Sequence, residues 1–132
     1  MNTKIEITQA SLKNFKKKLK NMSKEQERKL RNAVIETALL VESDSKMKTP
    51  VKTGRLRSSI HQENSSTTNY QYSDSTGKSY NGYLGGVKEK LQAIVGTNVR
   101  YALKQEAIHS YLSSAIAFNR IKFIEKVKKI LK

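Results

Sequence analysis

Cysteine and tryptophan are absent from this chain of 132 residues, and proline occurs once. Without cysteine, neither a disulfide framework nor a thiolate metal site can form. No stretch approaches the roughly 20 consecutive apolar residues of a membrane-spanning helix, and the N-terminal sequence lacks the apolar run of a secretory signal peptide. These absences predict a cytoplasmic protein, and the length predicts a single domain over residues 1–132.

Acidic residues are also scarce, with 11 aspartates and glutamates against 26 lysines and arginines and a net charge of +15. The excess indicates a polyanionic partner, either nucleic acid or an acidic protein surface. Lysines that merely solvate helix faces are the alternative. Two clusters hold much of the charge: Lys13, Lys16, Lys17, Lys18 and Lys20 near the start, and Arg120, Lys122, Lys126, Lys128, Lys129 and Lys132 near the end.

Residue patterns that carry catalysis or bind metals are missing too. His61 and His109 lie in different segments without the spacing of a zinc motif, and we expect both to be surface or partly buried histidines. The sequence TGKS, residues 76–79, lacks the upstream glycine of a phosphate-binding loop. The sequence therefore predicts no catalytic residue, no metal, no cofactor and no enzymatic activity.

Two helices are predicted at the N-terminal end. In the first, which Thr8 would cap, apolar residues recur at helical spacing: Leu12, Phe15, Leu19 and Met22. Ser23 and Gln26 have the spacing of a capping box and open the second helix. Its apolar stripe is Leu30, Val34, Ala38 and Val41, widened by Ile35 and Leu39. Such a broad stripe predicts a central helix packed on two sides, which ends at Thr49 and Pro50.

A sharp basic corner follows in the sequence KTPVKTGRLRSSI, residues 48–60. Thr53 is expected to cap a short turn over 54–58, in which Leu56 points inward while Arg55 and Arg57 point outward. Arg57 is expected to bond to carbonyls at the helix end or to a carboxylate. The corner is either purely structural or a partner contact through Arg55. Its expected structural residues are Pro50, Thr53, Gly54, Leu56, Arg57 and Ile60.

The middle of the chain changes composition. Residues 63–86 are rich in tyrosine, glycine and serine and cannot build a core of their own. They predict either an extended hairpin arm around Tyr70 and Tyr72 or a flexible loop. A strand is expected to begin at residues 58–62, and a second one over 87–97.

The C-terminal part predicts helices. A short one is expected to begin at Tyr101, and an amphipathic one follows with apolar residues at helical spacing: Leu112, Ile116, Phe123, Val127 and Ile130. The fold class is therefore α+β, with two N-terminal helices, a small antiparallel sheet carrying a long hairpin arm or loop, and a C-terminal amphipathic helix.

The corner and the second strand resemble a family of tailed-phage morphogenesis proteins, the small head–tail joining proteins also described as neck or tail-completion proteins. The corner matches the pattern Pro-Val-x-Thr-Gly-x-Leu-Arg-x-Ser-Ile at Pro50, Val51, Thr53, Gly54, Leu56, Arg57, Ser59 and Ile60. A second block matches at Val95, Gly96, Thr97, Tyr101, Ala102 and Glu106. The resemblance covers residues 28–131, although the glycine-containing turn before the family's last helix is replaced by AIHSYLSSAIAF, residues 107–118.

This resemblance implies a structural protein without enzymatic activity. It would form a homo-oligomeric ring at the head–tail interface of the virion, between the capsid connector and the tail, and let double-stranded DNA pass. Assembly would take place in the host cytoplasm, and no membrane is involved. The alternative is a stand-alone basic protein that binds nucleic acid. Candidate partner contacts are Arg55, Tyr70, Tyr72, Tyr80, Tyr83, Glu106, Lys16, Lys17, Lys128 and Lys129.

Overall fold

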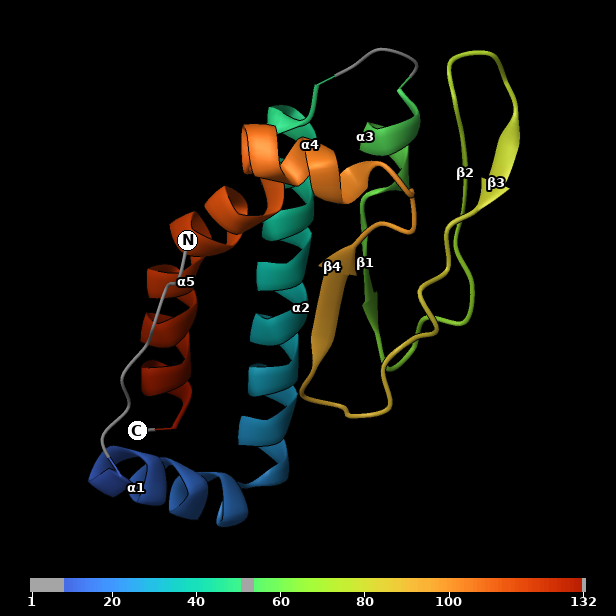
Figure 1. The fold of residues 1–132 in the computed structure, drawn as a ribbon. Coiled ribbons are helices and arrows are strands. Elements are labelled where there is room, and N and C mark those ends of the chain that lie inside the picture. The colour runs from blue at the N-terminus through green and yellow to red at the C-terminus, as the bar shows by residue number, and fades with distance from the viewer. Residues whose placement is uncertain (1–8, 51–53, 132) are drawn as a thin grey trace.

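A computed structural model describes residues 9–50 and 54–131 (Figure 1). Its elements, in chain order, are α1 (Gln9–Lys20), α2 (Lys24–Lys48), α3 (Arg55–Ser59), β1 (His61–Asn64), β2 (Gln71–Ser73), β3 (Ser79–Asn81), β4 (Ala93–Gly96), α4 (Ala102–His109) and α5 (Tyr111–Ile130). Helices combined with small antiparallel sheets confirm the predicted α+β class. The proposed cap Thr8 lies outside the described residues.

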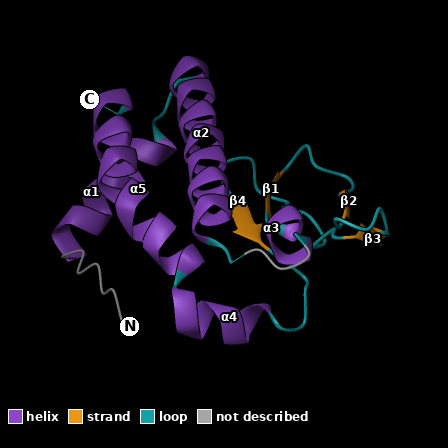
Figure 2. Cartoon of the chain, turned by 90° about the horizontal axis from the view of Figure 1, so that it is seen from above, coloured by secondary structure: helices purple, strands orange, loops and turns teal. Residues whose placement is uncertain are grey.

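Helix α2 is the central element, as predicted, with α5 on one flank and the β1–β4 sheet on the other (Figures 1 and 2). The predicted capping box is present, because Ser23 Oγ accepts from the Gln26 N–H and the Gln26 side chain accepts from the Ser23 N–H. Thr49 caps the C-terminus, directly before Pro50.

The packing of α2 against α5 differs from the predicted stripes. Leu30, Ala38 and Val41 are buried, but Leu39 is 47% exposed, because it lies roughly half a turn around α2 from Val41. On α5, Ile116 is 52% exposed.

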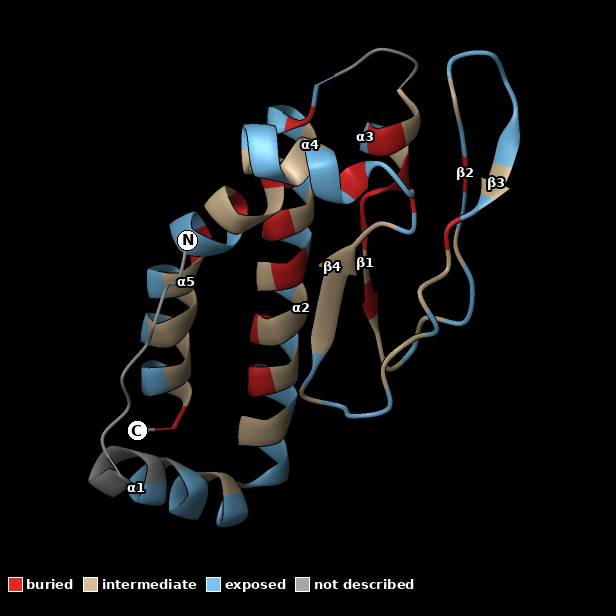
Figure 3. Cartoon of the chain, in the orientation of Figure 1, coloured by how far each residue is buried: buried red, intermediate tan, exposed pale blue. Residues whose placement is uncertain are grey.

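Tyr111, Ala115 and Asn119, spaced four residues apart, form the buried stripe of α5 (Figure 3). Asn119 Nδ2 donates to Oδ2 of Asp44 on α2 at 2.8 Å and to the Ala115 carbonyl at 2.9 Å. The buried amide is thus hydrogen-bonded, which offsets the cost of removing it from water.

Strands β1 and β4 pair antiparallel, with His61 opposite Gly96 and Asn64 opposite Ala93. The strand predicted over residues 87–97 is shorter in the structure, because only Ala93–Gly96 is extended and paired. The predicted start at residue 87 is therefore wrong. The chain turns just before β4, where the Gln92 N–H donates to the Glu89 carbonyl at 3.4 Å.

The hairpin predicted around Tyr70 and Tyr72 is confirmed, because β2 and β3 pair antiparallel with Tyr72 opposite Tyr80. Residues 63–86 form no core of their own, as expected, but they contribute to the core that other segments build. Tyr72 is only 7% exposed and belongs to the buried cluster of Leu56, Ile60, Tyr72, Val99, Ala102 and Tyr111. In Figure 1 the hairpin lies beside α3 and the β1–β4 sheet. This segment has few aliphatic residues, so an aromatic side chain, that of Tyr72, packs into the core in their place.

Candidate functional site

The basic corner that follows α2 is hydrogen-bonded to the end of that helix. Arg57 Nε donates to the Lys46 carbonyl at 2.8 Å, which is the bond to a helix-end carbonyl expected from the sequence. Leu56 and Ile60 enter the core as predicted. The short helix α3 begins one residue later than predicted, after Gly54 at φ +75°, a left-handed conformation that glycine adopts without strain. Thr53, the proposed cap, lies outside the described residues.

A stack of aromatic rings joins the corner to the hairpin. The rings of His61 and Tyr70 lie 3.6 Å apart and nearly parallel, and the stack continues through Tyr72 to Tyr80, whose centroids are 5.3 Å apart. The guanidinium carbon of Arg55 lies 4.1 Å from the Tyr80 ring centroid. The outward orientation predicted for Arg55 is therefore wrong, because the cation is attracted to the face of the ring.

His61 also forms a buried polar pair with Glu63, which the sequence did not reveal. His61 is 1% exposed and Glu63 is fully buried, so the expectation of a surface or partly buried His61 is wrong. His61 Nδ1 donates to the Ser59 carbonyl at 2.8 Å, and one proton lies between His61 Nε2 and Glu63 Oε2, which are 2.5 Å apart. Burial is tolerated because every polar atom of the pair has a partner.

Glu63 also holds the chain that returns from the hairpin. Its two carboxylate oxygens accept from the Leu84 N–H at 2.7 Å and the Gly86 N–H at 2.8 Å. Burial by itself raises the pKa of Glu63, but the hydrogen bonds from Leu84, His61 and Gly86 outweigh it and hold the pKa below its usual 4.5. An ionised Glu63 thus anchors residues 84–86, where the chain returns from the hairpin to the sheet.

The tip of the hairpin is organised by Asp74. Its Oδ1 accepts from the Thr76 hydroxyl, the Thr76 N–H and the Lys78 N–H, while Oδ2 accepts from the Tyr80 hydroxyl at 3.0 Å. The Thr76 hydroxyl, together with the other donors, lowers the pKa of Asp74 to about 2. The TGKS sequence thus belongs to a hairpin turn.

Two other candidate partner residues bond within the chain. Glu106 accepts from the Leu112 and Ser113 N–H groups, both at 2.9 Å, and so caps the N-terminus of α5. These hydrogen bonds, with those of the Ser113 hydroxyl and the Tyr111 N–H, overcome burial and lower the pKa of Glu106. The Tyr83 hydroxyl donates to the Thr67 carbonyl at 3.4 Å.

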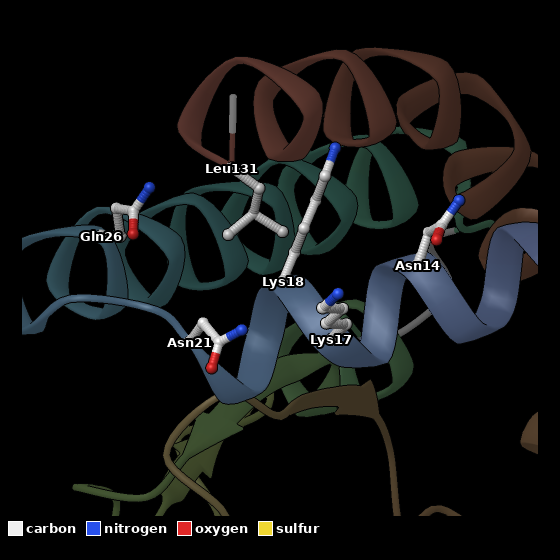
Figure 4. A pocket seen from close by; sticks show the side chains of 6 residues that line it. All are labelled: Asn14, Lys17, Lys18, Asn21, Gln26 and Leu131. Atoms are coloured by element: carbon white, nitrogen blue, oxygen red, sulfur yellow. The ribbon is translucent and has the colours of Figure 1, made fainter.

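The remaining candidates lie at one end of the molecule, where α1, the start of α2 and the end of α5 meet (Figure 1). Lys16, Lys17, Lys128 and Lys129 are all exposed. A hollow of about 340 Å³ opens between α1 and the helix ends (Figure 4). Its lining is rich in donors and consists of Asn14, Lys17, Lys18, Asn21, Gln26 and Leu131. We refer to this region as the basic end.

Most acidic side chains of the described residues already form a hydrogen bond or an ion pair with another group of the same chain. Those with a hydrogen bond or ion pair to another part of it are Glu25, Glu36, Glu42, Asp44, Glu63, Asp74 and Glu106. The lysines of the basic end therefore have few free carboxylates to meet on another copy of this chain.

Within residues 9–50 and 54–131, no cluster of histidine and carboxylate side chains could hold a metal ion. No helix in this part of the chain is long and apolar enough to cross a membrane.

A comparison with protein-family models matches residues 13–106 to the HK97-gp10-like family, described as "Bacteriophage HK97-gp10, putative tail-component". No curated protein and no solved structure matches the chain. The family match spans the corner, the hairpin, the β1–β4 sheet and α4 up to Glu106, which includes both blocks of the predicted resemblance. The chain belongs to the HK97-gp10-like family of bacteriophage proteins.

Proposed function

We propose that this protein is a structural component of the virion that forms an oligomeric ring at the head–tail interface. The ring joins the capsid connector to the tail and lets double-stranded DNA pass. In this proposal residues 1–132 form one domain, the chain has no enzymatic activity and needs no cofactor, and the subunits are made in the host cytoplasm before assembly. Membership of a family described as a phage tail component supports this proposal.

The observation that carries it is the uncompensated positive charge of the basic end. Lys16 and Lys17 on α1, together with Lys128 and Lys129 on α5, are exposed on neighbouring helix ends. Because most of the chain's own carboxylates are occupied, the complementary surface belongs to another protein. We propose that these lysines contact acidic surfaces of the neighbouring connector or tail proteins.

The passage of DNA through the ring limits where the lysines can lie. Each phosphate that a lysine neutralises releases counterions and strengthens DNA binding, so a lumen coated with lysine would retain the genome instead of letting it slide. The proposal therefore places the basic end against neighbouring proteins and leaves only a minority of the lysines on the channel wall.

Two charge reversals test the proposal: Lys16→Glu with Lys17→Glu, and Lys128→Glu with Lys129→Glu. The matched control is Lys48→Glu with Lys104→Glu, which makes the same charge change at exposed residues of α2 and α4, at the other end of the molecule. In a complementation assay we expect all three variants to fold and only the first two to leave heads and tails unjoined. Normal joining by both basic-end variants would contradict the proposed contact.

The same excess of positive charge supports the second candidate, a nucleic-acid-binding protein. It predicts that the isolated wild type binds duplex DNA tightly at about 0.15 M salt, with an affinity that falls steeply as salt rises. Both basic-end variants would lose that binding. The ring proposal predicts weak binding under the same conditions, so a fluorescence anisotropy titration separates the two.

A further inference from the structure

An apolar trough lies between the two elements that flank α2. Its floor is formed by α2, one wall by β4 with the residues just before it, and the other wall by α5. Figure 2 shows α5 and β4 on the two sides of α2. The trough has a volume of about 330 Å³, and its lining includes Val34, Val41, Ala93, Val95, Ile116 and Phe123. An apolar hollow of this kind is typical of a surface that another protein covers.

The outer side of α5 carries the complementary feature, an apolar ridge formed by Phe118 and Ile121. Both side chains are 63% exposed, and their spacing of three residues makes them neighbours on the helix surface. Phe118 lies two residues after Ile116 of the trough, and Ile121 lies two residues before Phe123. Two residues turn an α-helix by about 200°, so the ridge and the trough lie on roughly opposite sides of α5.

Charged side chains of both signs border each surface. Beside the trough lie three exposed residues of the turn before Leu91 and one half-buried residue of α5, namely Lys88, Glu89, Lys90 and Arg120. Beside the ridge lie three exposed residues of α5, namely Lys122, Glu125 and Lys128. Lys122 Nζ is 5.2 Å from the centroid of the Phe118 ring, and Glu125 follows Ile121 by four residues on the same side of the helix. Each surface thus has one carboxylate among several cations.

The carboxylates at these two surfaces are left over after folding. The side chains of Glu27, Glu89 and Glu125 form no hydrogen bond or ion pair with the residues that the structure describes. Glu27 is half-buried, and the two exposed ones are those beside the trough and the ridge. With the ridge in a trough, Glu125 would meet the cations of the turn and Arg120, while Glu89 would meet Lys122. Opposite charges would then face each other on both sides of the contact.

We infer that the ridge of one copy inserts into the trough of the next copy. A uniformly acidic partner would set like charges against Glu89 or Glu125, whereas a second copy brings a cation to each. The ridge and the trough are different surfaces, so the contact is head-to-tail and closes into a ring when the rotation permits. This inference rests on the proposed ring, for which it supplies the contact between subunits.

Crosslinking tests the contact directly, because the chain contains no cysteine of its own. Ala117→Cys places a thiol on α5 four residues before Ile121, and Gln92→Cys places one at an exposed residue that lines the trough. Both changes leave the ridge intact. The two variants, one of them tagged, are mixed at high protein concentration and about 0.3 M salt, which screens the repulsion between positive copies. A short bismaleimide should then join the two chains into a heterodimer.

The control mixes Ala117→Cys with Ser73→Cys, an exposed residue of the hairpin, and should give no heterodimer. Crosslinking of Ala117→Cys to itself in preference to Gln92→Cys would assign the ridge to a symmetric contact and overturn the inference. Absence of the heterodimer, both in the free protein and in particles assembled from the two variants, would leave the trough to another protein and overturn the inference as well.

The yield of the heterodimer supplies a second readout. Adding Phe118→Ser with Ile121→Ser to the Ala117→Cys chain removes the ridge and should lower the yield about tenfold or more. The matched control, Leu103→Ser with Ile108→Ser, removes side chains of α4 that are 82% and 62% exposed, and should leave the yield unchanged. Equal yields from the two variants would contradict the insertion of the ridge.

A charge reversal tests the pairing of the carboxylates. Glu125→Lys should lower the yield, whereas Glu25→Lys makes the same charge change at an exposed residue near the start of α2 and should not. Equal effects would contradict the charge pairing that selects a second copy. If the heterodimer is absent while heads and tails still join, the proposed function stands without this interface. If the heterodimer forms while both basic-end variants join heads to tails normally, this interface stands and the contact proposed for the basic end fails.

Discussion

Replacing Glu63 by glutamine tests whether the buried carboxylate anchors the hairpin to the sheet. Glutamine keeps the size of the side chain but replaces one acceptor oxygen by a donor. The N–H of Leu84 or that of Gly86 then faces an NH₂ group, and the interaction with His61 loses its charge. A hydrogen bond to a charged group contributes about 1.5–3 kcal/mol, and a buried donor left without an acceptor costs about 1–3 kcal/mol.

We therefore expect the free energy of unfolding to fall by about 3 kcal/mol. With a urea m-value of about 2 kcal/mol/M, the midpoint of urea unfolding at neutral pH should fall by about 1.5 M. Glu89→Gln, which makes the same change at an exposed residue, is the control and should cost less than about 0.5 kcal/mol. A midpoint for Glu63→Gln within about 0.3 M of the control would refute the anchoring role.

The pH dependence provides an independent check. Because the folded pKa of Glu63 lies below its usual 4.5, the stabilisation is present above pH 4.5 and is lost as pH falls through the folded pKa. The difference between wild type and Glu63→Gln should therefore shrink as the urea unfolding is repeated at progressively more acidic pH. A difference that stays constant down to acidic pH would mean that the charge of Glu63 contributes nothing.

Three further predictions concern the corner, α4 and the hairpin tip. Gly54→Val should cost about 2 kcal/mol from the left-handed backbone alone, since nothing lies within 4 Å of an added Cβ. Arg55→Ala should cost about 1 kcal/mol, because the guanidinium 4.1 Å from the Tyr80 ring centroid is lost and only Lys78 Nζ, at 5.4 Å, remains over the ring. Equal urea midpoints for the two variants would contradict this order. Tyr111→Phe leaves the Ala102 carbonyl without the 2.8 Å hydrogen bond and should cost about 1 kcal/mol. Burial raises the pKa of Tyr111 from 10.0 to about 12, so the stability of the wild type should fall between pH 10 and pH 12. The stability of Tyr111→Phe should fall less over the same range, which alkaline unfolding followed by circular dichroism would show. Asp74 should titrate at about pH 2 in carboxyl NMR spectra, so that the turn loses its stabilisation only as pH falls from 3.8 through that value; a midpoint near 3.8 would show that its hydrogen bonds do not form in solution.

Local signals predicted both ends of α2. The capping box at Ser23 and the stop at Pro50 depend on neighbouring residues alone, and both are confirmed. The bond from Arg57 to a helix-end carbonyl also followed from short-range geometry, because the corner returns the chain to the end of the helix that it has just left.

Contacts between segments that are distant in the chain could not be predicted from the sequence. His61 and Glu63 look like solvent-facing polar residues of a strand, and only the approach of residues 84–86 gives the carboxylate its backbone donors. Tyr70, Tyr72 and Tyr80 lie in a segment with the composition of a polar loop. Their packing depends on stacking with one another, with His61 and with Arg55, which brings together three separate segments and buries Tyr72.

The amide of Asn119 has a consequence for how α2 and α5 are aligned. Apolar side chains along two helices can interdigitate in more than one register, but the hydrogen bond from the buried Asn119 amide to Asp44 forms in only one of them. Sliding α5 by one turn, about 5.4 Å, would move this donor away from its acceptor. The pair thus sets how far the C-terminal end of α5 projects relative to the corner. In the proposed ring, this register would set the distance between the two ends of each subunit along α2 and α5.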